Sequence, residues 1–196
     1  ATDQGLALGA TLYGSSEAGI QPKIIPNYYL GSEYSNENIK RALELSGTKY
    51  FHLSNKDISK LASESLKNGK IIALYQGKSE FGPRALGNRS ILANPIIPDI
   101  KDQINKRIKF REEFRPFAPA VLEEFADKIF IINQPSPFMT ITAMVKEEWH
   151  NKVPGIVHVD GTARIQTVNK KQNKIFYSIL EEFNNRTGVP VLVNTS

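Results

Sequence analysis

The segment Gly77–Ser90, GKSEFGPRALGNRS, sets cationic side chains among glycines. Glycines permit positive φ angles and a close approach of the backbone to a ligand, and arginine can hold a phosphate through two parallel hydrogen bonds. The segment is not a Walker loop, because no Gly-Lys-Ser/Thr follows four residues after a glycine. It predicts an anion-binding loop, with a tight turn carrying an Arg84–Glu80 surface ion pair as the alternative. The side chains expected to serve the anion are Lys78, Arg84, Asn88, Arg89 and Ser90.

A second candidate segment is Lys109–Pro119, KFREEFRPFAP. Arg111 and Arg115 are four residues apart, with Phe114 and Phe117 between and beyond them. Packed phenylalanines would immobilise the guanidinium groups, so that an anion clamp loses less entropy on binding. The alternative is a hydrophobic hairpin that leaves both arginines exposed.

The third candidate segment is His158–Val168, HVDGTARIQTV. On a strand, Arg164 and Gln166 share one face, because successive side chains alternate. An arginine followed by a glutamine on one strand face is unusual for a core, so a binding site and an ordinary hairpin are both compatible with the pattern. His158 is a weak catalytic candidate, since lone histidines are mostly structural.

Nucleophilic and metal chemistry find little support in the residue types. The sequence has no cysteine, which excludes a thiolate nucleophile, a disulfide scaffold and a thiolate metal site. The other two histidines, His52 and His150, have no partner at metal-ligand spacing, and no Ser-His-Asp set can be singled out. Positioning and charge stabilisation remain as the chemistry that these residues can supply.

The charge of the chain is concentrated around the first two segments. The 196 residues carry a net charge of +5, and the window from Gly77 to Pro119 holds nine bases and five acids, or +4 of that total. No apolar run approaches the roughly 18 residues of a membrane-spanning helix, and the first residues lack a signal-peptide pattern. We therefore expect a cytoplasmic protein without a membrane partner. Because it lacks an initiator Met and ends abruptly, we expect a piece of a longer protein.

Helical and strand patterns alternate along the chain and predict an α/β or α+β fold. Residues 15–35 are rich in Gly, Pro, Ser and Asn and predict a linker, and residues 76–89 predict a loop. The segment 114–122 is expected to be extended, with Pro116 and Pro119 limiting its pairing. Helices are expected over 1–14 (buried), 35–46, 54–68, 99–109 and 171–185. Strands are expected over 50–53, 71–75 (buried), 139–145 and 189–193, and as a hairpin over 157–168 with its turn at Asp160-Gly161.

Four motifs together resemble the carboxy-terminal region of the O-carbamoyltransferases, the family of the nodulation-factor, cephamycin and tobramycin carbamoyltransferases. They are GKSEFGPRALGNRS, FREEFRPFAP, HVDGTARIQTV and the terminal TGVPVLVNTS. The resemblance runs from Asn27 to Ser196. The opening DQGLALGA is similar to the last nucleotide-site segment of the family's other domain, an ASKHA-type fold. The resemblance therefore implies a truncated ASKHA-like tail and linker over 1–26 and a YrdC-like domain over 27–196.

The resemblance also implies a function. The YrdC/Sua5-like domain, a twisted open sheet with flanking helices and a basic cavity, would make carbamoyl adenylate from carbamoyl phosphate and ATP, with release of phosphate and pyrophosphate. ATP is thus a co-substrate. The carbamoyl group would then pass to an unknown hydroxyl acceptor in the ASKHA-like domain. The metal of that domain is held by a His-x-x-x-His pair and an Asp; Asp3 matches the Asp, but the pair is absent, so we expect no competent metal site here.

Residue roles follow from the same resemblance. Ser136, in the SPFM stretch, resembles a family position that contacts the reacting phosphate. We expect Arg111, Arg115 and Ser136 to be catalytic, and Lys78, Arg84, Asn88, Arg89, Ser90, His158, Arg164 and Asn194 to bind substrate or nucleotide.

Two other functions are compatible with the residues. The pI of about 9.3 and the interleaving of Arg with Phe are typical of an RNA-binding YrdC-like module without chemistry. Against this, the bases lie at loop and strand junctions with rigid Gly and Pro, so a nucleic acid is not the expected partner. A stand-alone threonylcarbamoyl-adenylate synthase is the second alternative, and the DQGLALGA segment speaks against it.

Overall fold

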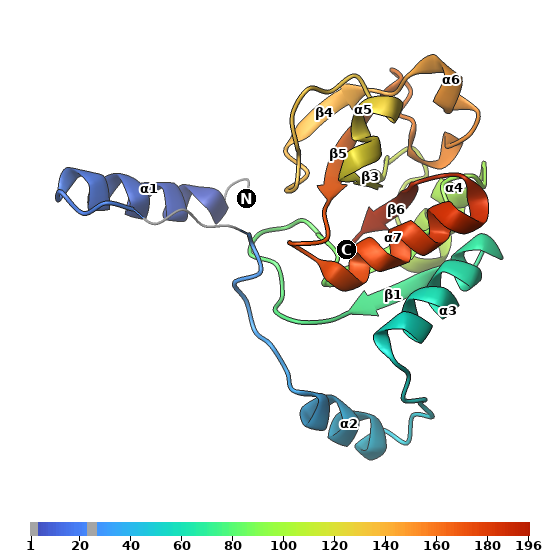
Figure 1. The fold of residues 1–196 in the computed structure, drawn as a ribbon, viewed down its shortest axis with the longest axis horizontal. Coiled ribbons are helices and arrows are strands. Elements are labelled where there is room, and N and C mark those ends of the chain that lie inside the picture. Colours follow the sequence, from blue (N-terminus) through green and yellow to red (C-terminus); the bar gives the residue numbers. More distant parts are fainter. Residues whose placement is uncertain (1–3, 23–26) are drawn as a thin grey trace.

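A computed structural model describes residues 4–22 and 27–196. Within these residues, six strands form one open mixed sheet in the order β1-β2-β6-β3-β5-β4, with helices beside it (Figure 1). The predicted α/β class and open sheet with flanking helices are confirmed. The strands are β1 Ile72–Tyr75, β2 Arg89–Ala93, β3 Ala118–Leu122, β4 Ile141–Met144, β5 Thr162–Val168 and β6 Val191–Thr195.

Three of the helices begin at polar caps that satisfy one of their first N–H groups. The side chains of Ser35, Ser54 and Asn173 each accept a hydrogen bond from a backbone N–H three residues on. The helices are α1 Gln4–Glu17, α2 Asn36–Leu45, α3 Asn55–Lys67, α4 Ile100–Ile104, α5 Ala126–Ile129, α6 Glu147–His150 and α7 Lys174–Thr187. A π-helical turn, η1 Asn105–Lys109, extends α4, and 3-10 turns cover η2 Glu123–Phe125 and η3 Pro154–Ile156. No described helix is long and apolar enough to cross a membrane.

The core lies under the middle of the sheet. Helix α7 contributes Phe176, Ile179, Leu180 and Phe183, all without solvent exposure, and it packs against α3 and the sheet (Figure 1). All five residues of β3 are buried, and β6 is buried from Val191 to Asn194. These two central strands position the site described below.

The prediction that Pro116 and Pro119 limit the pairing of 114–122 is confirmed in part, because residues 114–117 belong to no strand and pairing begins only at Ala118. Strand β3 pairs antiparallel with β6 and parallel with β5. Pro119 lies opposite Val193 of β6, whereas the register with β5 begins one residue later, at Ala120. A proline is tolerated in this central strand because it lies ahead of the first residue paired with β5.

Four further expectations are corrected. Residues 50–53 form no strand, and the predicted hairpin over 157–168 contains only β5, whose antiparallel partner is β4. Strand β1 is an edge strand with alternating partial burial and is therefore not buried. Helix α1 is present, but it stands apart from the sheet in Figure 1 and exposes Leu6 and Tyr13 by 74% and 69%.

Candidate anion-binding site

The loop between β1 and β2, residues 76–88, is organised by the carboxylate of Glu80. Its Oε1 atom accepts hydrogen bonds from the backbone nitrogens of Leu86 at 2.8 Å, Asn88 at 2.9 Å and Arg89 at 3.1 Å. A carboxylate is a strong acceptor for several N–H groups at once. Glu80 therefore serves the backbone of the loop, and the surface ion pair with Arg84 is not formed.

Arg89 closes the base of the same loop. Its guanidinium donates to four backbone carbonyls and stacks on the ring of Tyr75, with 3.7 Å between the guanidinium carbon and the ring centroid. Both terminal nitrogens of Arg89 are therefore bound to the backbone of the protein, and this side chain supports the loop. The four carbonyls are those of Ser32, Gln76, Gly77 and Asn88.

Asn88 and Ser90 also hold the loop together. The amide of Asn88 donates to the carbonyl of Lys78 at 2.7 Å and accepts from Asn173, the cap of α7, at 2.9 Å. Ser90 Oγ accepts from the backbone nitrogen of Gly87 at 2.9 Å. Both side chains are buried and engaged with the protein, whereas Lys78 is exposed. The neutral groups of the motif therefore shape the loop in this structure.

Arg84 and Arg164 differ from Arg89 because they lack partners. Both are half-buried, and the Nε atom of each is buried without a hydrogen-bond partner among the described residues. Neither guanidinium forms an ion pair with a described carboxylate. Burial lowers the pKa of Arg164, and the nearby positive charge of Arg84 lowers it further. Two uncompensated cations close together in a partly dry site favour the arrival of an anion.

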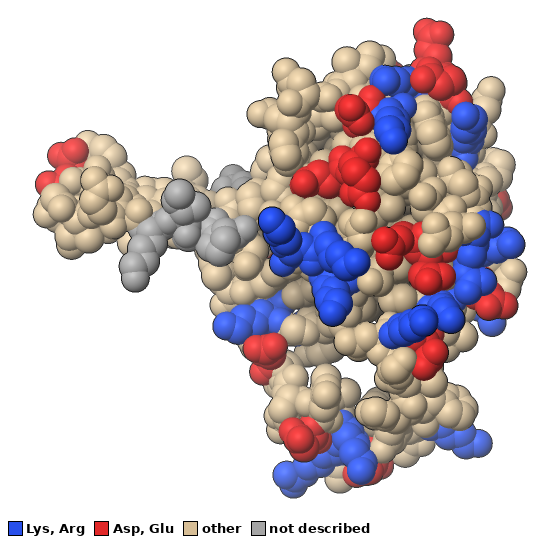
Figure 2. All heavy atoms as spheres, viewed as in Figure 1, with Lys and Arg blue, Asp and Glu red and all other residues tan. Residues whose placement is uncertain are grey.

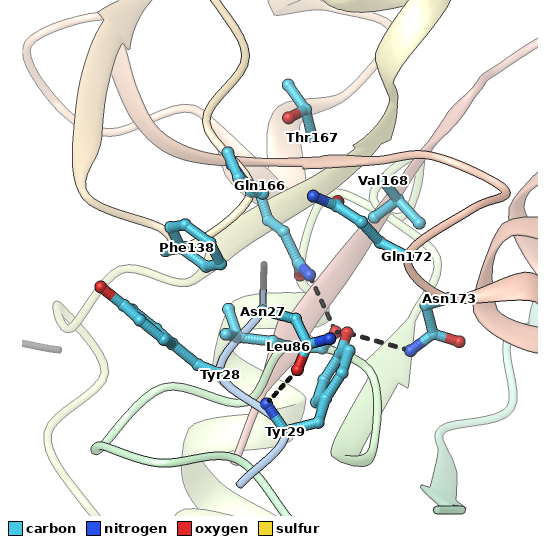
Figure 3. Close-up of a pocket in the computed structure, with 11 residues that line it drawn as sticks. Asn27, Tyr28, Tyr29, Leu86, Phe138, Gln166, Thr167, Val168, Gln172 and Asn173 are labelled. Carbon is cyan, nitrogen blue, oxygen red and sulfur yellow. Dashed lines mark hydrogen bonds between the residues drawn. The ribbon is translucent and has the colours of Figure 1, made fainter. Parts of the chain in front are cut away.

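Two amide side chains meet beside these arginines. Asn194 of β6 donates through Nδ2 to Gln166 Oε1 of β5 at 2.7 Å and to the carbonyl of Ala85 at 3.0 Å. Gln166 in turn donates to the carbonyl of Leu86 at 2.8 Å, and Figure 3 shows this side chain converging on Leu86 together with Tyr29. The Oδ1 atom of Asn194 is left buried without a partner among the described residues.

His158 lies on the other side of Arg164. It is half-buried, and burial lowers its pKa. The charge of Asp160 and a hydrogen bond to the backbone of Phe117 oppose this shift, while the nearby Arg164 and Lys101 add to it. His158 therefore belongs to the same electropositive neighbourhood and favours its neutral form there.

Arg111 is held over the ring of Phe117, with 4.9 Å from the guanidinium carbon to the ring centroid. Its Nε donates to Asn105 Oδ1 at 2.8 Å, and Asn105 is fully buried. The amide nitrogen of Asn105 donates to the carbonyls of Glu113 and Arg115, which fixes the turn that carries Arg111. Burial lowers the pKa of Arg111, and the charge of Arg115 adds to this shift.

Arg115 is less constrained. It forms an ion pair with Glu112 at 2.9 Å, and about half of each side chain is exposed. Phe114 is 82% exposed and does not anchor either arginine, so of the two expected phenylalanine anchors only Phe117 lies beneath a guanidinium.

Ser136 is buried against β5. Its hydroxyl donates to the carbonyl of Ile165 at 2.8 Å, and its backbone nitrogen donates to Thr167 Oγ1 at 2.9 Å. The hydroxyl proton of Ser136 is thus already donated to a backbone carbonyl of the protein. Contact of Ser136 with a reacting phosphate stays a prediction.

The structure brings Arg84, Arg164 and Asn194 together, with His158 alongside and Arg111 beyond Phe117. Sequence reasoning had placed Gln166 on the face of Arg164 without giving it a role, and it missed the contributions of Glu80 and Asn105. For Asn105 the sequence carries no signal, because an asparagine in a helical segment is ordinarily exposed. The described residues contain no group of three or more side chains suited to hold a metal ion, and Asp3 lies outside them.

The fold is an open α/β sheet, and two arginines with Nε atoms unpaired among the described residues lie near each other, Arg84 in the loop between β1 and β2 and Arg164 within β5. The family model for the carbamoyltransferase C-terminus matches residues 63–196, and the chain belongs to this family. It is 44% identical over its whole length to nodulation protein NolO of Bradyrhizobium diazoefficiens, covering 37% of that protein. It is 41% identical to nodulation protein NolNO of Sinorhizobium fredii, covering all of this chain and 30% of that protein. The chain thus spans about a third of the length of these relatives.

Proposed function

We propose that this domain binds carbamoyl phosphate and ATP and forms carbamoyl adenylate. The observation that carries the proposal is the pair Arg84 and Arg164, two half-buried cations without a protein counter-ion. A dianionic phosphate would satisfy their orphaned donors and relieve their mutual repulsion. Membership in the carbamoyltransferase family supports a carbamoyl group as the group carried by that phosphate.

The proposed reaction needs one water molecule to balance. Water cleaves carbamoyl phosphate into carbamate and inorganic phosphate, and an oxygen of carbamate then attacks the α-phosphorus of ATP. A new carbon–oxygen–phosphorus link forms as pyrophosphate leaves. Charge stabilisation and in-line positioning account for such phosphoryl chemistry without a side-chain nucleophile.

We assign the enclosed pair Arg84 and Arg164 to the small acyl phosphate. We assign the exposed cations Lys78 and Arg115 and the half-buried Arg111 to the larger triphosphate of ATP. His158 lies next to Arg164 and favours its neutral form, so it can accept a proton from the attacking water.

We further propose that the carbamoyl group is passed to a hydroxyl acceptor by residues outside this chain. The acceptor must be held in line with the carbamoyl carbon, and a group must ease the loss of its proton. The chain covers about a third of its relatives, and we expect no carbamoylated product when it is incubated alone with ATP, carbamoyl phosphate and a panel of sugar or antibiotic acceptors.

Binding of RNA is the competing function. On the face drawn in Figure 2, basic and acidic side chains are interspersed, which does not favour binding of a polyanion across this face. A salt titration discriminates the two. Affinity for RNA would fall steeply with salt concentration because many counterions are released, whereas a small enclosed site gives a shallow dependence.

The direct test is pyrophosphate release from ATP in the presence and absence of carbamoyl phosphate. We expect release that requires carbamoyl phosphate and that falls by about tenfold or more in Arg84→Ala and Arg164→Ala, the loss typical of one charge-assisted contact. Arg41→Ala removes an exposed arginine from α2 and is the matched control. Wild-type rates in both site variants would refute the assignment.

A further inference from the structure

We infer that Asn194 recognises the amino group of the carbamoyl ligand and selects carbamoyl phosphate over other acyl phosphates. This inference rests on the proposed function and names the protein atom that would contact the acyl group. Asn194 is 1% exposed, and its Oδ1 is a buried acceptor without a donor among the described residues. A buried acceptor left unpaired is costly, so its persistence in a polar site points to a donor carried by the ligand.

The orientation of the Asn194 amide is fixed by its neighbours. Its Nδ2 faces two acceptors, the carbonyl of Ala85 and Gln166 Oε1. Gln166 cannot reverse its own amide, because its Nε2 is needed by the carbonyl of Leu86. Turning the Asn194 amide around would set its oxygen against both acceptors. The orphaned atom is therefore an oxygen held in place, which accepts a hydrogen bond and cannot donate one.

The small residues of β3 make this arrangement possible. Asn194 and Gln166 belong to β6 and β5, which both pair with β3 and do not pair with each other. Ala118 lies opposite Asn194 and Ala120 lies opposite Gln166 in the two registers. The alanine side chains of β3 are methyl groups, so the two amides can meet across the central strand.

Two further buried atoms without a partner among the described residues, the Nε atoms of Arg84 and Arg164, indicate which ligand would fit beside Asn194. A third such atom, Nε of Arg186, belongs to α7. Arg84 precedes Ala85, whose carbonyl holds Asn194, and Arg164 shares a strand with Gln166. Their unpaired Nε atoms are donors that require an acceptor. The complementary molecule carries an anionic acceptor group and, a short distance away, an N–H donor. Carbamoyl phosphate has both, whereas acetyl phosphate presents a methyl group to the asparagine oxygen.

The test compares binding of carbamoyl phosphate and acetyl phosphate to the whole chain by isothermal titration calorimetry, without ATP. We expect the wild-type chain to prefer carbamoyl phosphate by about tenfold, the effect of leaving a buried polar group unpaired. In Asn194→Ala this preference should fall to within about twofold, while the affinity for acetyl phosphate stays within about threefold of wild type. Asn185→Ala, an exposed asparagine on α7, is the control and should keep the wild-type preference.

The possible outcomes distinguish failure of the role proposed for Asn194 from failure of the proposed function. Equal binding of the two acyl phosphates by the wild-type chain overturns the role of Asn194, and this measurement does not depend on whether the variant folds. An unchanged preference in a folded Asn194→Ala protein overturns it as well. Absence of binding of either acyl phosphate, with inorganic phosphate also failing to bind, would instead remove the proposed function itself.

Discussion

The carboxylate of Glu80 lies 2.8 Å from the backbone nitrogen of Leu86, six residues further along the same loop. Two more backbone N–H groups reach the same oxygen atom. This single side chain therefore fixes the stretch that carries Arg84 and that presents the Ala85 and Leu86 carbonyls to the two strand amides. The negative charge of Glu80 thus shapes the loop in which we propose that a negative ligand binds.

Replacing Glu80 with Ala should destabilise the protein and disorder the anion site together. We expect the free energy of unfolding to fall by about 1.5–3 kcal/mol, because three backbone donors lose a charged acceptor. Urea unfolding measures this change, and titration with inorganic phosphate measures the loss of binding. The exposed Glu33→Ala is the control for loss of one negative charge, and an effect of Glu80→Ala no larger than that of Glu33→Ala would contradict the role assigned to Glu80.

Replacing Arg164 with Gln should weaken phosphate binding without lowering the stability of the unliganded protein. Arg164 is half-buried beside Arg84, so removal of its charge relieves repulsion and leaves the unliganded melting temperature unchanged or raised. Phosphate affinity should fall by about tenfold, the value of one charge-assisted contact. Thermal melting with and without phosphate reports both quantities. A large drop in melting temperature without ligand would indicate that Arg164 is a structural residue.

Arg111 and Arg115 should differ in their contribution. We expect Arg111→Ala to lower carbamoyl-phosphate-dependent pyrophosphate release by about tenfold or more, because Arg111 is held between Asn105 and Phe117. Arg115→Ala should have a smaller effect, since Arg115 is about half exposed and already paired with Glu112. Parallel assays of pyrophosphate release by the two variants show which substitution causes the larger loss. Equal losses would show that the anchoring of Arg111 is irrelevant.

The stability of the protein should depend on the protonation of His158. Burial holds its pKa below the ordinary value of 6.5, so below pH 6.5 the unfolded chain binds a proton that the folded chain does not. The stabilising contribution is therefore complete above pH 6.5 and is lost as the pH falls toward the folded pKa. Urea midpoints at pH 7.5 and 5.5 should differ more in the wild type than in His158→Gln. The exposed His52→Gln is the control, and identical differences in wild type and His158→Gln would remove His158 as the cause.

Sequence reasoning found the elements that depend on local chemistry. Ser35 and Ser54 identified two helix starts because a cap is a local interaction, and apolar spacing located the strand that became β6. The incorrect predictions concern segments whose structure depends on strands that are distant in the sequence. Residues 157–168 looked like a hairpin, but the partner of β5 is β4, from an earlier part of the chain. The prolines of 114–122 argued for a poorly paired segment, yet Pro119 is accommodated in a central strand.

The sequence predicts the loop over residues 76–89, but it does not predict that Arg84 and Arg89 have different hydrogen-bond partners there. Arg84 and Arg89 have the same chemistry in the sequence, and only the fold distinguishes them. Arg89 is saturated by backbone carbonyls, whereas Arg84 has none within reach. Ser90 likewise forms a hydrogen bond within the loop, and Asn88 forms one with Asn173, the cap of α7. Two residues of the same type can differ in role because their hydrogen-bond partners differ. A single sequence does not reveal those partners.

The position of β6 has a consequence for how the protein is made. It is the last strand in the chain, yet it joins β2 to β3 in the middle of the sheet. Until these residues have left the ribosome, the two halves of the sheet cannot be connected, and the facing edges of β2 and β3 stay open to pairing with other chains. Since β6 also carries Asn194, the sheet and the proposed ligand site are completed in the same folding event. Deletion of β6 would therefore be expected to yield an aggregation-prone chain rather than a folded one with a weakened site.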